Sequence, residues 1–235
     1  MLLVAALTPL VPLSAHALDW KLTPSLGASA TLTDNASQSA NGEGALVLSV
    51  TPGIDVQSEG SRRVQARLNY GLSLLERIGG NVNDQNDINH RLNASGKAEI
   101  AEDLFFVEGT ANISQALGSL LGAPGDGSLD TGNSITAATY SISPYLTKRF
   151  GTFGDGILRY RRSGAIFEDS ANVGNIGSDS IEAALNSGTQ FKDLLWGLNY
   201  SLRESETGAG DDTRFESYGA TLGYAMTRKF RLKGA

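Results

Sequence analysis

The feature that most restricts the fold of this chain is an alternation of apolar and polar residues with a period of two, which recurs from residue 20 onward. In residues 20–33 every even position is apolar and every odd position is polar or glycine, and residues 63–74 repeat the pattern. Successive side chains of a β-strand point to opposite faces, so these segments are predicted to be strands with one apolar and one polar face. Neither an 18-residue apolar run nor a sustained 3.6-residue period follows Trp20.

The pattern predicts ten strands and the beginning of an eleventh. Many of these segments reach the roughly 9–11 residues that a tilted strand needs to cross a membrane, whereas strands of soluble proteins usually have about 5–6. The expected strands cover residues 20–33, 45–56, 63–74, 89–101, 105–117, 134–147, 153–167, 179–191, 194–203 and 214–226, with another starting at Phe230.

The predicted connections alternate between short and long along the chain. Short links are expected at 58–62, 102–104, 148–152, 192–193 and 227–229, and long polar ones at 34–44, 76–88, 118–133, 168–178 and 204–213. Outer-membrane barrels have short periplasmic turns and long extracellular loops. The fold class expected is therefore all-β, a transmembrane antiparallel up-and-down β-barrel, with the short turns in the periplasm.

The N-terminal segment has the features of an export signal. Residues 2–13 are nearly all apolar, and Ala15-His16-Ala17 matches the small-x-small pattern that a signal peptidase accepts. The run is too short for a transmembrane helix and contains Pro9 and Pro12, so a retained anchor is the weaker alternative. We expect a signal peptide at 1–17, a barrel at 18–235 and a location in the outer membrane of a Gram-negative cell. Because no Lys or Arg precedes the run, we expect the true start to lie upstream.

Aromatic residues gather beside the predicted short turns, where the interfacial aromatic girdle of a barrel would lie. The alternative is that they are ordinary core aromatics of a soluble β-sandwich, which would spread them along the strands. The residues are Trp20, Phe105, Phe106, Phe150, Phe153, Phe191, Trp196 and Phe230.

Composition excludes several classes of function. The chain has no Cys, so thiolate catalysis and cysteine-ligated metals are excluded, and a net charge of −6 argues against sequence-independent nucleic-acid binding. His16 leaves with the signal peptide, and His90 has no partner at a catalytic spacing and is expected at the surface. The acidic stretches 84–87 and 125–127 lack the ligand spacing of an EF-hand. We predict no catalytic residue, no metal and no cofactor, and hence no enzyme.

Charged and amide side chains on the polar faces are expected to line the lumen. Two interpretations stay open: opposite charges on neighbouring strands pair and brace the wall, which we favour, or a basic wall attracts anionic solutes or an acidic polysaccharide. The candidates are Arg63, Arg67, Arg91, Lys97, Glu99, Glu108, Asn112, Arg159, Arg161, Glu182, Asn186 and Arg203. Arg162 is an exception, because its position predicts an apolar, lipid-facing side; either a bulge near Gly154 and Gly156 shifts the register or its side chain reaches the headgroups.

Four N-terminal motifs resemble a known family. The segments 20–26 (WKLTPSL), 33–35 (TDN), 50–54 (VTPGI) and 59–63 (EGSRR) are similar to those of proteobacterial outer-membrane proteins associated with the PEP-CTERM/exosortase system. The resemblance is strongest over about the first seventy residues. It implies a β-barrel whose partners, besides outer-membrane lipid, are exopolysaccharide or its export machinery.

The function expected from this resemblance is exopolysaccharide export or surface attachment. The alternatives are a general diffusion porin, for which 118–133 is the candidate constriction loop, and a non-conducting surface scaffold or adhesin. Members of the family are longer, and residues 233–235 do not close a terminal strand on an aromatic residue. We therefore expect this chain to be the N-terminal portion of a larger barrel.

Overall fold

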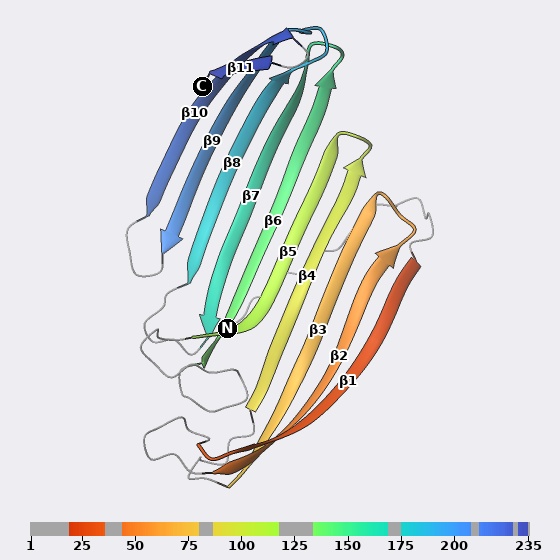
Figure 1. The fold of residues 1–235 in the computed structure, drawn as a ribbon, viewed down its shortest axis with the longest axis vertical. Coiled ribbons are helices and arrows are strands. Elements are labelled where there is room, and N and C mark those ends of the chain that lie inside the picture. The colour runs from red at the N-terminus through yellow and green to blue at the C-terminus, as the bar shows by residue number, and fades with distance from the viewer. Residues whose placement is uncertain are drawn as a thin grey trace, which may run out of the picture.

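The computed structural model describes residues 19–35, 44–79, 87–117, 134–168, 175–207, 212–227 and 230–234, and within these ranges the chain is all-β. Its strands form one antiparallel up-and-down sheet in sequence order (Figure 1), so this coarser part of the expected fold is confirmed. The strands are β1 (Asp19–Thr33), β2 (Ala45–Glu59), β3 (Val64–Ile78), β4 (Asp87–Ala101), β5 (Phe105–Leu117), β6 (Ser134–Phe150), β7 (Gly154–Glu168), β8 (Ile176–Ser187), β9 (Leu194–Thr207), β10 (Thr213–Thr227) and the short β11 (Phe230–Gly234).

The register of the pairings keeps the two kinds of side chain on opposite sides of the sheet. What we call the polar face consists of the odd positions of β1–β4, β6, β7, β9 and β10 and the even positions of β5 and β8. The opposite positions form the apolar face. A one-residue slip would exchange the two faces, so the alternation itself specifies this register.

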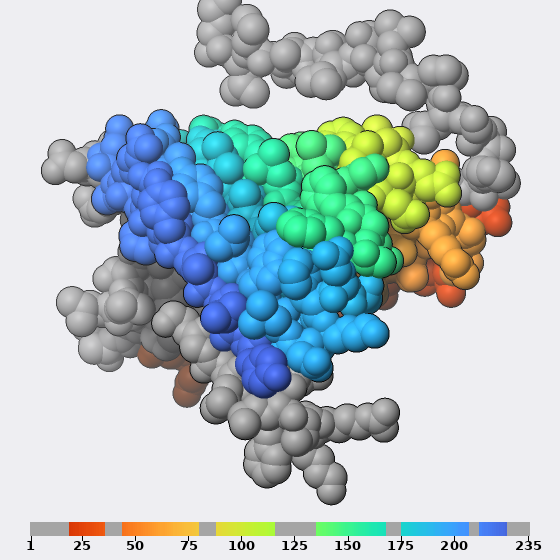
Figure 2. Space-filling model, turned by 90° about the horizontal axis from the view of Figure 1, so that it is seen from above, coloured from red at the N-terminus to blue at the C-terminus, as the bar shows by residue number. Residues whose placement is uncertain are grey.

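Over β6, β7 and the long-connection halves of β2 and β3, exposure is inverted relative to a soluble protein. Along the short-turn halves of β3 and β4 it is not, because Arg67 and Lys97 on the polar face are exposed and Leu68 on the apolar face is half-buried. All eight residues with buried side chains among those described lie on the polar face, and they include Arg77, Ser143 and Ser180 as well as Val47 and Tyr145. By contrast, the large exposed hydrophobic residues of the strands lie on the apolar face, apart from Ile176, Leu195 and Phe215. Side chains on the concave side of a curved sheet lie closer together and are more buried than those on the convex side. Because the buried side chains lie on the polar face, the sheet curls toward that face where they occur. Figure 2, which looks down on the short-turn end, shows the strands following one another round this curved wall.

Both edges of the sheet are open. Within the described ranges β1 pairs only with β2, and β11 pairs only with β10. The sheet is therefore not closed in this structure, and the closed barrel expected from the sequence stays a prediction.

The strands are strongly staggered relative to one another. One row of paired residues runs from Leu22 on β1 through Tyr140 on β6 to Glu206 on β9. Leu22 lies three residues from the short-turn end of β1, whereas Glu206 lies twelve residues from the short-turn end of β9. The stagger of nine residues over eight strand steps is about 30 Å along the strands against about 38 Å across them, which is a tilt of about 38° if the strand ends are level.

The β8–β9 connection differs from the expected one. We expected a strand to Phe191 and a two-residue link, but β8 ends at Ser187 and the link spans 188–193. Gly188 donates its backbone N–H to Phe153 O at 2.7 Å, and Gln190 donates to Thr152 O at 2.9 Å. The link is thereby bonded to the β6–β7 turn instead of continuing β8. A Cβ on Gly188 would overlap the backbone of that turn, so only glycine fits there.

The alternation of long and short connections holds as far as β8 but fails at the C-terminal end, where the short link 188–193 has six residues and the next long connection, 208–212, has five. The predicted signal peptide at 1–17, the segment 118–133 and the acidic stretch 125–127 lie outside the described residues. No helix in the described part of the chain is long and apolar enough to cross a membrane.

Candidate functional site

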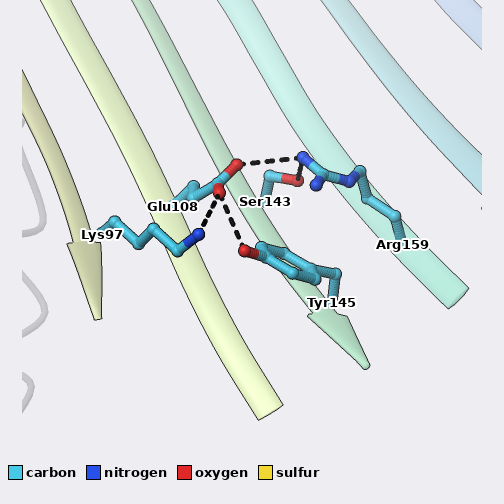
Figure 3. A network of polar contacts seen from close by, with 5 residues as sticks. All are labelled: Lys97, Glu108, Ser143, Tyr145 and Arg159. Carbon is cyan, nitrogen blue, oxygen red and sulfur yellow. Dashed lines mark hydrogen bonds and ion pairs between the residues drawn. The ribbon is translucent and has the colours of Figure 1, made fainter. Parts of the chain in front are cut away.

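The most connected group of polar side chains lies on the polar face and joins four adjacent strands (Figure 3). This Glu108 cluster consists of Lys97 on β4, Glu108 on β5, Ser143 and Tyr145 on β6, and Arg159 on β7, together with the ring of Phe106 on β5. Glu108 Oε2 accepts a hydrogen bond from Arg159 Nη1 at 3.0 Å, and Glu108 Oε1 accepts one from the Tyr145 hydroxyl at 2.9 Å. Lys97 Nζ lies 3.5 Å from Glu108 Oε1. Alternation along each strand brings these residues to one face, and the register brings them to one height.

Aromatic rings support the two cations of the Glu108 cluster. Phe106 stacks on Tyr145 with ring centres 5.1 Å apart and planes 13° from parallel. Arg159 Cζ lies 4.2 Å from the centre of the Tyr145 ring, and Lys97 Nζ lies 5.3 Å from that of Phe106. A guanidinium or ammonium over an aromatic face is attracted by the ring quadrupole. The rings therefore hold both cations beside the single carboxylate.

The contacts of the Glu108 cluster link the strands from β4 to β7. Arg159, whose side chain is 18% exposed, donates to Glu108 and also to Ser143 Oγ at 3.4 Å. Two cations and one carboxylate leave one positive charge that faces the concave side. Within the cluster the Ser143 hydroxyl contacts Arg159 and the Tyr145 hydroxyl donates to the Glu108 carboxylate, so the arrangement can bind and orient a polar ligand.

The other predicted lumen residues are distributed over the polar face rather than gathered into one site. Arg67 Nη2 lies 3.4 Å from Asp55 Oδ2 on β2, and Glu99 accepts the backbone N–H of Asp103 at 2.7 Å in the β4–β5 turn. Arg63 lies in the turn at 60–63, 2.7 Å from Glu102 Oε2 in the next turn. The remaining positions lie on polar-face register positions of their strands, namely Arg91, Asn112, Arg161, Glu182, Asn186 and Arg203.

A second feature of the polar face is a hollow of about 430 Å³ over β1–β5. Most of its lining groups are hydroxyls and amides, and Arg91 also lines it. Gly53 and Gly71 are paired at its floor, and a Cβ on Gly53 would come within 2.7 Å of Ser25 Oγ, so glycine keeps the hollow open. The hydroxyl and amide residues are Ser25, Ser29, Ser49, Thr51, Asn69, Ser73, Asn89 and Gln115.

The predicted girdle residues divide between the two faces. Trp20, Phe105, Phe150 and Trp196 occupy apolar-face positions at the short-turn ends of their strands. Phe106 is on the polar face, in the Glu108 cluster. Phe153 and Phe191 lie in connections, where they pack with Trp196 at ring-centre distances of 5.5–5.6 Å. The backbone of Phe230 begins β11, and its side chain is outside the described part.

Sequence reasoning missed a group of tyrosines and charges on the apolar face, which we call the tyrosine–carboxylate patch. Asp179 on β8 accepts hydrogen bonds from the Tyr160 hydroxyl and from Arg162, both on β7. The patch continues on β9 and β10, where Glu216 accepts the hydroxyls of Tyr200 at 2.9 Å and Tyr218 at 2.6 Å, and Arg214 Nη1 lies 3.3 Å from Glu204 Oε1. These residues occupy even or odd positions that belong to the apolar face of their strands. Continuing the alternation to the end of each strand would have assigned them to that face.

The patch also explains the exceptional position of Arg162. The β7 register runs without a shift from Gly154 to Ala165 against β8, so the bulge that we considered is absent and Arg162 does face the apolar side. Its charge is balanced by Asp179 directly across the strand pair.

His90 lies on the apolar-face parity of β4, and its Nδ1 is 2.8 Å from the Tyr70 hydroxyl. Across the described ranges, no three His, Asp or Glu side chains are close enough together to hold a metal ion.

Comparison of the chain with known proteins found no matching family model, no matching curated protein and no matching solved structure. The resemblance seen in the N-terminal motifs therefore stays a prediction.

Proposed function

We propose that this chain forms part of the wall of a transmembrane β-barrel in an outer membrane. Its apolar face would contact lipid and its polar face would line the lumen. The observation that carries the proposal is the series of large exposed hydrophobic residues on the apolar face, set against polar side chains buried on the other face. Leu32 and Tyr218 are 83% and 75% exposed on the apolar face, while Arg77 on the polar face is 6% exposed. Such an arrangement is unfavourable in water and favourable in hydrocarbon.

Strand length and tilt support the same proposal. Nine of the eleven strands have 13 residues or more, beyond what soluble sheets usually need. A tilt of about 38° lies within the range of about 35–45° found in transmembrane barrels. In lipid the unpaired backbone groups of β1 and β11 need partners, so the proposal includes closure of the sheet into a barrel.

As cargo we propose a polysaccharide, which rests on the family resemblance and on the hollow over β1–β5. Hydroxyl and amide groups such as those of Ser49, Asn69 and Gln115 suit sugar hydroxyls, and the Glu108 cluster adds a stacked aromatic pair and one net positive charge. A polymer with acidic sugars would be attracted by this charge.

Depth-dependent quenching of fluorescence tests the membrane part. The chain has two tryptophans, Trp20 and Trp196, and both lie at the short-turn end. In vesicles of brominated phospholipids we expect both to be quenched most by bromines near the glycerol backbone. Single-tryptophan versions, Trp20→Phe and Trp196→Phe, assign the signal to each side of the wall. Unquenched fluorescence in a folded, vesicle-bound protein would rule the proposal out.

Conductance in planar bilayers separates the candidate functions. For the full-length protein, export predicts a conductance that acidic exopolysaccharide blocks, and a general porin predicts an open channel indifferent to that polymer. A non-conducting protein that still binds cells or polymer would instead be a scaffold or adhesin.

A further inference from the structure

The two sides of the wall carry their first outward-facing charge at different heights above the short-turn end. On β7 this residue is Arg162, eight residues above Gly154, and on β8 it is Asp179, eight residues above Ser187. On β9 it is Glu204, ten residues above Leu194, and on β10 it is Glu216, eleven residues from Thr227. With a rise of about 2.6 Å per residue along the membrane normal, from a strand rise of about 3.3 Å and the tilt, the charge-free height here is about 21–29 Å.

The β1–β5 flank remains uncharged to a greater height. On β1 the apolar face reaches Leu32, thirteen residues above Asp19, without a charge, and on β2 it reaches Leu46, thirteen residues below Glu59 in sequence. On β3 the first charge is Glu76, twelve residues above Val64. The same conversion gives a charge-free height of about 31–34 Å. On average the two flanks therefore differ by about three residues, or about 9 Å.

The tyrosines of the patch are oriented like residues at a membrane boundary. Tyr160 and Tyr200 lie six residues above the short-turn ends of β7 and β9, below the charges that they bond. Their rings face outward among apolar neighbours, and their hydroxyls reach up to Asp179 and Glu216. An amphipathic ring with its apolar body in hydrocarbon and its hydroxyl among polar groups is the usual arrangement at the headgroup level.

We propose that the tyrosine–carboxylate patch is a contact for lipid headgroups, and that it sets the outer boundary of the hydrocarbon lower over β7–β10 than over β1–β5, so that the wall thins the bilayer on one side. The inference rests on the proposed membrane function. Its occupant is lipid because the patch places amphipathic tyrosine rings beside polar groups, as at a headgroup boundary. Most of its charge is held in internal pairs, Arg162 with Asp179 and Arg214 with Glu204 and Glu216, which leaves one negative charge. The charge-free height over β7–β9 also matches the apolar band of about 25 Å that barrels present to lipid.

Depth measurements at matched heights test the inference. In the full chain carrying Trp20→Phe and Trp196→Phe, one tryptophan is placed at Val50 on β2, nine residues from the short-turn end, or at Leu202 on β9, eight residues from it. Vesicles with bromines near the glycerol and near the middle of the acyl chain compare the two depths. Val50→Trp should be quenched more by the deep bromines, and Leu202→Trp more by the shallow ones. We expect the two quenching ratios to differ by about twofold or more, since a step of about 9 Å is nearly a third of the hydrocarbon thickness.

A matched control lies low on the same two strands. Val56→Trp and Leu198→Trp are three and four residues from the short-turn ends, below the point where the flanks diverge, and should give equal depths. Equal depths at Val50 and Leu202 would overturn the inference while leaving the membrane function intact. Quenching at Val50 without any at Leu202 would show protein on the patch and would also overturn it. Absence of quenching in the unsubstituted protein is a different result, because it rejects the proposed function itself.

Discussion

The β1–β5 and β7–β10 flanks have similar polar faces and different apolar faces. Both present hydroxyls, amides and paired charges to the concave side, as at Arg67 with Asp55 and Arg159 with Glu108. On the outside, β1 and β2 are uncharged over their whole described length, whereas β7, β8 and β9 each carry a charge within ten residues of the short turns. The difference teaches that alternation alone assigns a residue to the apolar or the polar face. Whether an apolar-face position carries a charge depends also on its distance from the short-turn end of the strand.

The strongest test of this difference is an arginine placed at one height on each flank. Val50→Arg puts the charge between Ala28 and Leu74, and we expect a loss of about 2–4 kcal/mol in the free energy of unfolding. Leu202→Arg puts it opposite Glu216, where the expected loss is about 0–1 kcal/mol. Denaturant unfolding from lipid vesicles measures both. Equal losses would mean that the flanks lie in the same surroundings.

The Glu108 cluster joins the two flanks, because it links β4 to β7. Glu108→Ala leaves the Lys97 and Arg159 cations facing each other without their carboxylate, and we expect it to cost about 2 kcal/mol. In single-tryptophan versions, the transitions reported by Trp20 and Trp196 should move apart. Tyr145→Phe is the control, because it removes one hydrogen bond, expected to cost about 1 kcal/mol, and keeps the ring. Coincident transitions in Glu108→Ala would contradict a coupling role.

Removing the charges of β7 and β8 should make that flank resemble β1 and β2. The double variant Arg162→Leu with Asp179→Leu takes away both members of the ion pair and extends the uncharged part of β7 as far as Ile166. In vesicles of longer-chain lipids we expect the free energy of unfolding to rise by about 1 kcal/mol relative to the unsubstituted protein. The reason is that the uncharged height of this flank then matches the thicker hydrocarbon layer more closely. The single variant Arg162→Leu should lose stability because Asp179 keeps its charge. A double variant indifferent to chain length would argue against the thickness step.

Ion pairs at the short turns should make the smallest difference and the same one on both flanks. Arg63 with Glu102 and Arg149 with Asp155 are both exposed, at 2.7 and 2.9 Å. Arg63→Ala and Arg149→Ala are each expected to leave the midpoint of equilibrium unfolding almost unchanged. A larger loss on one flank would show that the flanks differ in more than their apolar faces.

Much of the fold could be predicted from alternation alone. Each expected segment became a strand, because only one face of a segment such as 63–74 can be apolar, and each hairpin fixes its neighbour's register. The 188–193 link could not be predicted, since Phe191 continues an apolar pattern but is held over the β6–β7 turn by bonds to residues far along the chain. Phe106 and Phe105 are adjacent in sequence, so a girdle inferred from position alone included both, although they lie on opposite faces.

The candidate site was less predictable than the fold. Lys97, Glu108 and Arg159 could each be assigned to the polar face, but their meeting depends on the stagger of four strands. Tyr145 joins them for the same reason. Stagger is set by turn geometry and pairing across strands, which a single strand's pattern does not contain.

The strict neighbour-to-neighbour order of the strands also bears on how the wall assembles. Every pairing from β1 to β11 joins strands that follow one another along the chain, and the longest connection among them spans the sixteen residues 118–133. Loop closure of that size is fast, so hairpins can form and add to a growing edge one after another. In the proposed closed wall the partner of β1 is the exception, because the strand that pairs there is not its neighbour along the chain. Closure is therefore expected to be the slow, final step, and until then the edge of β1 is the part of the molecule most open to pairing with the wrong chain.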